Sequence, residues 1–279
     1  MEIPEDMSFP PVDYTYLRDL VLSLSQNVLD PSRDYLFETR LSKLLRNHGL
    51  IHLSELVHQL RCKKNPSMER AIAEAMTINE TSFFRDGRPF ELLRTVLLPQ
   101  IIEKRRAAHS LRIWSGACST GQEGYSLAML IKEHFPLLSG WRIQIEGTDI
   151  CSEVVQRAQA GAYLRIEINR GLPARFIVRY FDHIGEDWIA KDEIKKICNF
   201  RVTNLCVPPL PFNEPFDVIF LRNVMLYFSM DARKVLLANI HRLLAPDGIL
   251  FLGSSEQPAD PSIWKSILAG GTCYFTPKH

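Results

Sequence analysis

Residues 113–129 read IWSGACSTGQEGYSLAM, and this stretch predicts the fold of most of the chain. An apolar run typical of a buried strand leads into a turn of small residues, and a helical pattern follows. A strand, a small-residue turn and a helix form the geometry of a nucleotide site at the carboxyl end of a first parallel strand. Gly116, Ala117 and Ser119 would let a ligand approach the backbone closely.

The same turn admits a second interpretation. It does not read GxGxxG, and it lacks the Lys-Ser/Thr pair of a P-loop, so nothing in it demands a phosphate. A tight corner whose small residues serve only packing would have the same composition. The turn by itself therefore leaves open whether a ligand binds there.

The composition sets broad limits. The chain has 279 residues, is 46% hydrophobic and carries a formal net charge of +1, which fits one large or two modest globular domains. Without a strong positive charge we expect no nucleic-acid partner. The sequence contains neither a membrane-spanning apolar run nor a signal peptide, so we expect a cytoplasmic protein without membrane insertion. Six cysteines without CxxC spacing predict reduced thiols and no metal site.

The first part of the chain is predicted to be helical. Leucines recur at helical spacing over residues 13–80, which predicts four or five short helices. One longer helix is expected over residues 89–106, and Pro99 within it is a candidate for a kink.

Buried strands alternate with helices in the remainder of the chain. This alternation, closed by TCYFTP, predicts an α/β fold with a doubly wound sheet and an antiparallel C-terminal strand. The alternation breaks between about residues 163 and 203, where we expect a small antiparallel β insertion. The predicted domains are an all-helical N-terminal domain over residues 1–88 and an α/β domain over residues 89–279.

The helical part carries an excess of positive charge. Between Arg33 and Lys64 there are seven basic residues and three acidic ones. Arg40, Lys43 and Arg46 recur every three residues and so lean towards one side of a helix. An ordinary solvated helix face accounts for this pattern, and so does a docking face for an acidic partner.

Two further stretches carry polar residues at informative positions. IEGTDI places Asp149 at the end of a predicted strand, where it could bind both hydroxyls of a ribose or simply cap a helix. NAD and S-adenosylmethionine both contain a ribose. TINETSFFRD, residues 77–86, sets Asn79, Thr81 and Arg85 beside two phenylalanines. A loop anchored in a core explains the phenylalanines but not the polar side chains.

Five blocks in order give the chain a family resemblance: AMTINETSFFRD, RIWSGACSTGQEGYSLAM, GTDI, RVTNL and FDVIFLRNVMLYF. The chain resembles the chemotaxis receptor methyltransferase family (CheR), which methylates receptor glutamates with S-adenosylmethionine. The resemblance covers about residues 13–275. It implies an all-helical N-terminal domain, a Rossmann-type methyltransferase domain and a small antiparallel β-subdomain inserted into the latter, in agreement with the three regions described above.

The resemblance also implies roles for individual residues. The cofactor would be S-adenosylmethionine, released as S-adenosylhomocysteine, with no metal. The residues expected to bind it are Asn79, Thr81, Arg85, Ala117, Glu123, Asp149, Asn204, Leu205, Arg222 and Asn223. Arg85 and Tyr227 are expected to act at the reaction centre.

The chain departs from the usual family wording, which is close to WSAGCSTGEEPYS. Gly116 and Ala117 are exchanged, but both stay small. Gln122 replaces an acid and so removes a negative charge near a cationic cofactor. Gly124 replaces a proline and costs up to ~1 kcal/mol of helix stability.

The implied chemistry needs few catalytic groups. A glutamate with a pKa near ~4.3 is ionised at neutral pH, so methyl transfer to it requires no general base. Positioning and exclusion of water would then carry catalysis, with Arg85 and Tyr227 orienting the carboxylate and the methyl group. Cys118 is expected to pack as a small apolar residue.

The expected partner is the cytoplasmic helical bundle of a methyl-accepting chemoreceptor. The basic helices at about residues 40–64 would meet its acidic surface in a salt-sensitive way. Some family members grip a receptor C-terminal peptide with the β-subdomain, but the short hairpin turn here, with its single glycine, favours a form that needs no tether. We also expect the protein to be a monomer. Three alternatives stay open: another methyl acceptor, a regulatory module that binds S-adenosylmethionine or S-adenosylhomocysteine, and a dinucleotide oxidoreductase.

Overall fold

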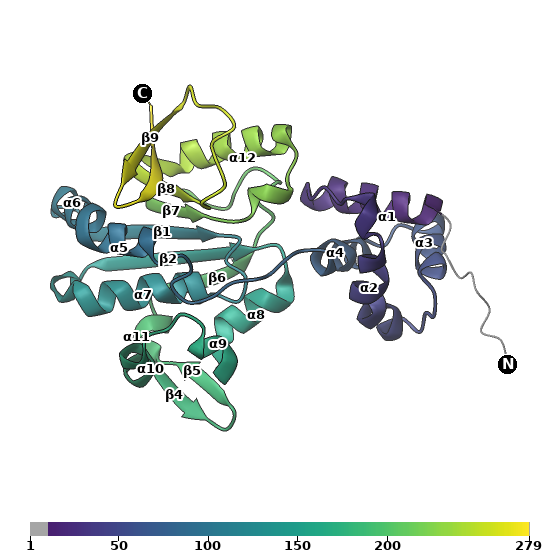
Figure 1. The fold of residues 1–279 in the computed structure, drawn as a ribbon, viewed down its shortest axis with the longest axis horizontal. Helices are drawn as coiled ribbons and strands as arrows, with labels where there is room; N and C mark the ends of the chain where they lie inside the picture. The colour runs from purple at the N-terminus through teal and green to yellow at the C-terminus, as the bar shows by residue number, and fades with distance from the viewer. Residues whose placement is uncertain (1–10, 279) are drawn as a thin grey trace. The chain divides into compact units, whose positions relative to one another are not determined.

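The computed structural model describes residues 11–278 (Figure 1). These residues form two compact units, each held together by contacts within it. The first unit extends to Ile78 and includes Tyr227–Ser229, and the second contains Asn79–Leu226 and the chain from Met230. The sequence placed the division after residue 88. It falls earlier because residues 79–86 (the NETSFFRD block) pack in the second unit.

Phe83 anchors that block. Its side chain is fully buried, and its ring lies 5.0 Å from that of Tyr163 and 5.7 Å from that of Phe181, both edge-on. Burial of an aromatic ring of this size contributes roughly 2 kcal/mol or more. The block is therefore part of the second unit's core and not a linker.

The first unit is all-helical from residue 11 onwards, as predicted. Its α-helices are α1 (Pro11–Ser25), α2 (Tyr35–Asn47), α3 (Leu53–Cys62) and α4 (Pro66–Ala75), with a 3-10 turn at Pro31–Arg33. The helices enclose an apolar core that includes Leu17, Val21, Phe37, Leu41, Leu56 and Ile72. Asn65 caps α4, since its Oδ1 accepts the Met68 N–H at 3.2 Å.

A seven-stranded sheet forms the centre of the second unit. Its strands are β1 (Ser110–Gly116), β2 (Arg142–Asp149), β6 (Cys198–Val202), β7 (Phe216–Leu221), β8 (Leu244–Leu252), β9 (Trp264–Ala269) and β10 (Thr272–Pro277). The order is β6-β2-β1-β7-β8-β10-β9, and β10 pairs antiparallel with β8 while the first five strands are parallel. The predicted doubly wound sheet with an antiparallel C-terminal strand is confirmed.

The direction of winding reverses at β1. The chain runs outward from β1 through β2 to β6, and then returns to β7 on the other side of β1. A crevice at such a switch point, outside the carboxyl ends of the strands, is the usual ligand site of open α/β sheets. The stretch IWSGACSTGQEGYSLAM supplies β1, this crevice edge and the next helix.

Two α-helices of this unit precede the first strand of the sheet in the sequence, and the others connect its strands. The bounds are α5 (Arg88–Leu92), α6 (Leu98–Lys104), α7 (Gln122–His134), α8 (Ser152–Ala160), α11 (Asp192–Lys195) and α12 (Met230–Leu243). A π-helical segment, Leu93–Leu97, joins α5 to α6, so the predicted long helix is continuous but widened just before Pro99. Proline lacks the amide hydrogen that a regular helix would donate one turn back. No helix within residues 11–278 is long and apolar enough to span a bilayer.

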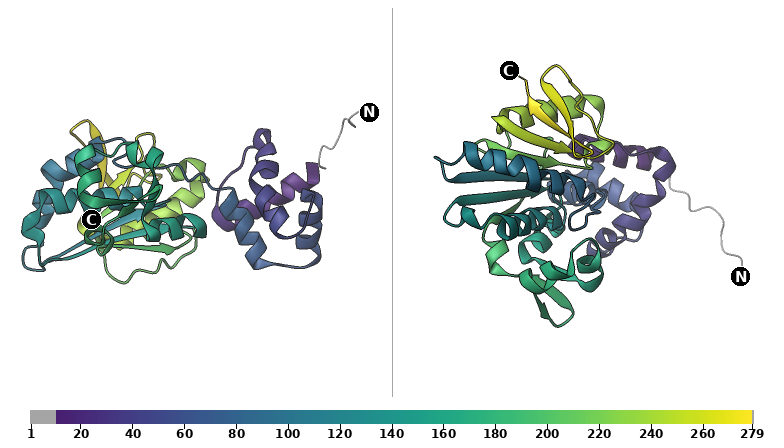
Figure 2. Two further views of the ribbon diagram at one scale, coloured as in Figure 1. Left: turned by 90° about the horizontal axis from the view of Figure 1, so that it is seen from below. Right: turned by 60° about the vertical axis from the view of Figure 1, so that its left-hand side comes forward.

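The chain between β2 and β6 forms a second, small antiparallel sheet. It consists of β3 (Ala162–Leu164), β5 (Asp187–Ala190) and β4 (Phe181–Ile184), with α9 (Arg165–Asn169) and α10 (Ala174–Tyr180) between β3 and β4. Figures 1 and 2 show it set apart from the seven-stranded sheet. The predicted antiparallel insertion is present, but its expected span also included β6, which instead pairs in parallel with β2.

Phe200 on β6 explains one departure from the family wording. Its ring lies over two glycines of neighbouring elements: a Cβ on Gly124 would lie 3.1 Å from Phe200 Cε1, and one on Gly147 only 2.3 Å from Cδ1. Gly124 therefore costs helix propensity but leaves room for a buried aromatic ring between α7 and the sheet.

Candidate functional site

The turn after β1 has an unusual backbone. Ala117, Ser119 and Gly121 have φ values of +56°, +50° and +90°. The Cys118 N–H donates to the Thr148 carbonyl at 2.9 Å, which fastens the turn to the end of β2. Two non-glycine residues in the left-handed region of one turn are uncommon and cluster at functional sites.

Asp149 lies at the end of β2, as predicted, and is 5% exposed. Its Oδ2 accepts the Ser119 N–H at 2.8 Å, and its Oδ1 accepts the Cys151 N–H at 3.0 Å before α8. Both bonds go to backbone N–H groups that precede the first residue of α8, so Asp149 fixes the two turns and does not cap that helix. A carboxylate oxygen has two lone pairs, so a ribose hydroxyl can still bind beside these backbone donors.

The NETSFFRD block runs along this turn. Ser119 Oγ donates to the Asn79 carbonyl at 2.7 Å, and the Phe84 N–H donates to Ser126 Oγ on α7 at 2.9 Å. Phe84 itself has a φ of +49°. The block is therefore held in a strained path against the turn and the first turns of α7.

Ser126 should be needed for that path. Substituting Ser126→Ala removes the acceptor of the Phe84 N–H, and we expect a loss of about 1–2 kcal/mol in the free energy of unfolding. Urea denaturation measures it. Ser23→Ala is the control, because the exposed Ser23 hydroxyl donates only to the Leu20 carbonyl; equal losses in both variants would contradict the prediction.

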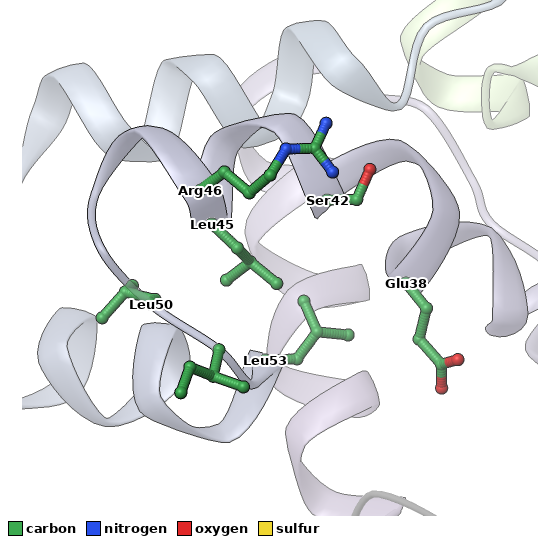
Figure 3. A pocket seen from close by; sticks show the side chains of 7 residues that line it. Glu38, Ser42, Leu45, Arg46, Leu50 and Leu53 are labelled. Atoms are coloured by element: carbon green, nitrogen blue, oxygen red, sulfur yellow. The ribbon is translucent and has the colours of Figure 1, made fainter.

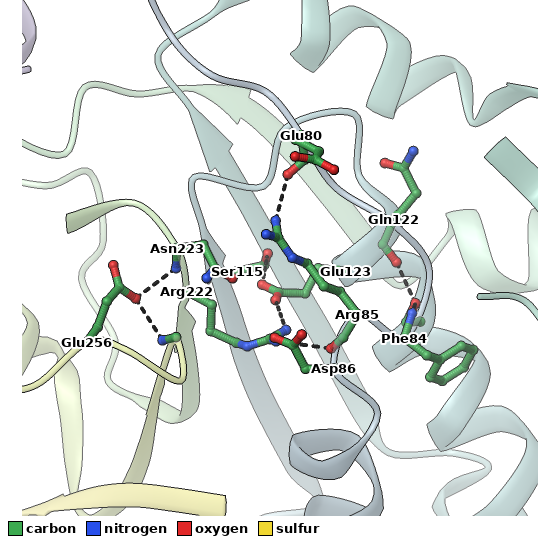
Figure 4. A network of polar contacts seen from close by, with 12 residues as sticks. Glu80, Phe84, Arg85, Asp86, Ser115, Gln122, Glu123, Arg222, Asn223 and Glu256 are labelled. Carbon is green, nitrogen blue, oxygen red and sulfur yellow. Dashed lines mark hydrogen bonds and ion pairs between the residues drawn. The ribbon is translucent and has the colours of Figure 1, made fainter. Parts of the chain in front are cut away.

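Arg222, directly after β7, joins three segments (Figure 4). Its side chain is 3% exposed, and Nη1 donates to Glu123 Oε2 at 3.0 Å. Its Nη2 donates to Asp86 Oδ2 at 2.5 Å and to the Arg85 carbonyl at 3.0 Å. The other oxygen of Glu123 accepts the Ser115 hydroxyl at 2.7 Å. One buried guanidinium thus ties the NETSFFRD block to α7 and β7.

A small pocket opens at this network. Its lining residues are Glu80, Thr81, Arg85, Ala117, Cys118, Glu123, Arg222 and Asn223. Six of them were predicted from the sequence, and Glu80 and Cys118 are additional. Arg85 Nη1 donates to the Glu80 carbonyl at 2.8 Å.

The other predicted residues lie outside this lining. Asn79 and Asp149 are bound to the same turn. Asn204 and Leu205 follow β6, where Asn204 Oδ1 accepts the Cys206 N–H at 2.9 Å and Leu205 is buried. Tyr227 groups with the first unit, and its carbonyl accepts the Val28 N–H at 2.8 Å.

Cys118 is not a nucleophile by its environment. Burial, assisted by the negative charges of Asp149 and Glu123, raises the pKa of the Cys118 thiol well above its usual range. The thiol stays protonated at neutral pH and packs as an apolar group, as the sequence predicted.

The sequence missed several contributors. The sequence assigned no role to Ser115, Asp86 or Glu256, and it did not predict that the Ser119 hydroxyl binds the Asn79 carbonyl. Gln122, whose role the sequence left unexplained, is 2% exposed, and its Oε1 accepts the Thr120 hydroxyl at 2.8 Å. An amide in place of an acid avoids a buried charge at this position.

The side chains at the crevice fit a zwitterionic nucleoside cofactor. Asp149 and Glu123 offer carboxylate oxygens for ribose hydroxyls or an ammonium group, and Arg85 offers a guanidinium for a carboxylate. Fold and pocket together are typical of a Rossmann-type domain that binds a nucleoside cofactor.

Comparison with known proteins gives the family. The model described as "CheR methyltransferase, SAM binding domain" matches residues 79–270, most of the chain. The chain belongs to the CheR methyltransferase family, and its cofactor is S-adenosylmethionine.

Curated relatives cover nearly the same length. The chain is 38% identical to "Chemotaxis protein methyltransferase 1" of Pseudomonas aeruginosa and 36% identical to "Chemotaxis protein methyltransferase Cher2" of Pseudomonas putida, each over 90% of this chain and 92% of the relative. It is 30% identical to "Chemotaxis protein methyltransferase" of Escherichia coli, over 92% of this chain and 88% of the relative.

The basic face of the first unit is less uniform than predicted. Arg40 is half-buried, and its Nη1 donates to the Thr77 carbonyl at 2.9 Å, so it is not part of a free surface. Lys43 and Arg46 are exposed. Figure 3 shows Arg46 beside a shallow hollow whose lining residues are Glu38, Ser42, Leu45, Arg46, Leu50, Ile51 and Leu53. The exposed basic residues therefore share α2 with an acid.

Proposed function

We propose that this protein transfers a methyl group from S-adenosylmethionine to glutamate side chains of chemoreceptors, forming glutamyl methyl esters. The supporting observation is the pocket at the switch point, where Arg222 ties Glu123 to the NETSFFRD block. The names of the curated relatives support chemotaxis as the process. The activity is thus a protein-glutamate O-methyltransferase.

The side chains of the protein position the acceptor carboxylate against the methyl group and exclude water from the site. S-adenosylmethionine, when bound, supplies a methyl group on a cationic sulfur. The acceptor glutamate is already ionised at neutral pH, so no side chain needs to remove a proton. Arg85 orients the incoming carboxylate at the pocket, and Tyr227 is its proposed partner near the methyl group. Opposite charges meet and cancel in this transfer, which a dry site favours.

We assign the cofactor contacts to residues of this pocket and to residues of the turn and strand ends beside it. Glu123 and Asp149 hold the ribose and amino-acid end, with Asn79, Thr81 and Ala117 along the turn. The residues that complete the cofactor site are Asn204, Leu205, Arg222 and Asn223.

The proposed partner is the acidic helical bundle of a chemoreceptor in the cytoplasm, met by the monomeric protein. Exposed Lys43, Arg46, Lys63 and Lys64 supply positive charge for this contact, which should weaken with salt. The β4–β5 hairpin turns at Gly185 over two residues, and we propose that a receptor peptide tether is not needed.

Arg85 provides the direct test. In the Arg85→Ala variant we expect receptor methylation to fall about 100-fold or more, because misplaced reactants lose that much rate. Binding of S-adenosylhomocysteine should also weaken, because Arg85 is assigned to the cofactor as well, but by a smaller factor than methylation falls. The assay uses labelled S-adenosylmethionine and receptor-bearing membranes and counts base-labile methyl esters.

Arg88→Ala is the matched control, since Arg88 is exposed and lies outside the pocket lining. Full methylation by Arg85→Ala would refute the assigned role. If the wild-type protein binds S-adenosylhomocysteine but forms no methyl esters on receptors, it is a regulatory module or uses another acceptor.

A further inference from the structure

Glu256 is a buried acid that the proposed chemistry does not use. It lies four residues after β8 and is 5% exposed. Its Oε2 accepts the Asn223 N–H and the Gly253 N–H, both at 2.7 Å, and its Oε1 accepts the Met225 N–H at 2.8 Å. Figure 4 shows the carboxylate facing this backbone. A single carboxylate therefore holds the segments that follow two neighbouring strands, β7 and β8.

The held segment is strained and lines the pocket. Asn223 has a φ of +59°, in the left-handed region, which is uncommon for non-glycine residues although Asn adopts it more readily than most. Strain of this kind persists only where the surroundings impose it. Asn223 also lines the pocket next to Arg222.

Gly253 completes the arrangement. A Cβ at this position would lie 2.6 Å from Glu256 Oε2 and 2.8 Å from Asn223 Nδ2. No side chain larger than hydrogen fits between the acid and the strained residue. The contact is closely packed as well as hydrogen-bonded.

We propose that Glu256 is a positioning residue for cofactor binding: its carboxylate fixes the left-handed conformation of Asn223 and so directs this residue to the pocket. The proposal rests on the assignment of Asn223 to the cofactor site. Charge-assisted bonds to backbone N–H groups are about twice as strong as neutral ones, and here three of them act on one short segment. Glu256 itself is absent from the pocket lining and acts through Asn223.

The first test is calorimetry with S-adenosylhomocysteine on the full chain. In Glu256→Gln an NH2 group replaces one of the two carboxylate oxygens and cannot accept a hydrogen bond from a backbone N–H. The affinity for S-adenosylhomocysteine should therefore fall about 10-fold or more. Glu146→Gln is the matched control, because Glu146 is also 5% exposed but accepts from Asn199 and Arg201, outside the lining. The affinity of Glu146→Gln for S-adenosylhomocysteine should stay within about 2-fold of wild type, since a substitution away from the pocket leaves the pocket unchanged.

The second test asks whether Glu256 acts through Asn223. If it does, the double variant Glu256→Gln/Asn223→Ala binds S-adenosylhomocysteine no more weakly than Asn223→Ala alone. Additive losses, or an unchanged affinity in Glu256→Gln, would overturn the proposal. A purely structural role would lower the urea midpoint of both glutamate variants and leave the affinity of the folded protein unchanged, which also overturns it.

If Glu256→Gln does not fold, Glu256→Asp replaces it. Aspartate keeps the charge but is one methylene shorter, so it cannot reach all three N–H groups, and reduced affinity is again expected. The readout is binding and not methylation. Failure of the receptor assignment would leave these affinities untouched, whereas failure of this proposal would leave methylation of receptors by the wild type untouched.

Discussion

Replacing Arg222 with methionine should lower the free energy of unfolding by about 3–5 kcal/mol, because it leaves partly buried carboxylates without their cation. Glu123 and Asp86 both lose their ion-pair partner Arg222, and the Arg85 carbonyl loses a donor. The same change should remove measurable binding of S-adenosylhomocysteine, since the NETSFFRD block loses its tie to Glu123 at the pocket. Methionine keeps most of the volume, so the loss reports charge and hydrogen bonds.

Arg105→Met is the matched control for Arg222→Met. Arg105 also bridges two acids of the same unit, at 2.6 Å to Asp217 and 2.5 Å to Asp247, but lies outside the pocket lining. We expect it to lose stability while the folded protein keeps its cofactor affinity. Urea denaturation and calorimetry separate the two effects. Wild-type affinity in folded Arg222→Met would contradict a role of Arg222 in assembling the pocket.

Gly147→Ala should be the most damaging small substitution in the sheet. Its new methyl group would lie 2.3 Å from Phe200 Cδ1 and 3.2 Å from Cys118 Sγ, in a core that cannot widen. Overpacking of this kind costs about 1–3 kcal/mol or more, and we expect the upper end. Thermal or urea unfolding measures the loss.

A second-site change tests the cause. Phe200→Leu removes the ring that the methyl group meets, so the double variant Gly147→Ala/Phe200→Leu should be more stable than the sum of the two single losses predicts. Additive losses would show that Phe200 is not the obstacle. Gly124→Ala should cost less stability than Gly147→Ala, because its new methyl group would require Phe200 to shift by only a few tenths of an ångström.

Much of the fold could be predicted because its signals are local. IWSGACSTGQEGYSLAM carries a strand, a turn and a helix within one short stretch, and TCYFTP has the length and composition of a strand. β6 was missed as a member of the main sheet because CNFRV is short, lies inside an irregular region and buries only Phe200 fully, so it shows no continuous apolar run. β9 was missed because WKSILA, paired only with β10 among the described strands, is largely exposed.

The candidate site divides in the same way. Asp149 could be placed from the sequence because the end of a parallel strand fixes where its side chain lies. The partner of Glu123 could not, since Arg222 is 99 residues away and Asp86 is 136 residues from Arg222. Glu256 gave no signal, because an acid that binds only backbone N–H groups has no fixed spacing to them.

By itself the sequence determined most of the strands and helices, the position of the turn after β1, and the family sequence motifs that the chain contains. These follow from periodicity and from residues a few positions apart. Only the tertiary structure decided which charges pair, that Arg40 is held internally, and why Gly124 and Gly147 carry no side chain. The crossovers of the sheet bring distant strand ends together, and a charge or a ring finds its partner there by proximity in space and not in sequence.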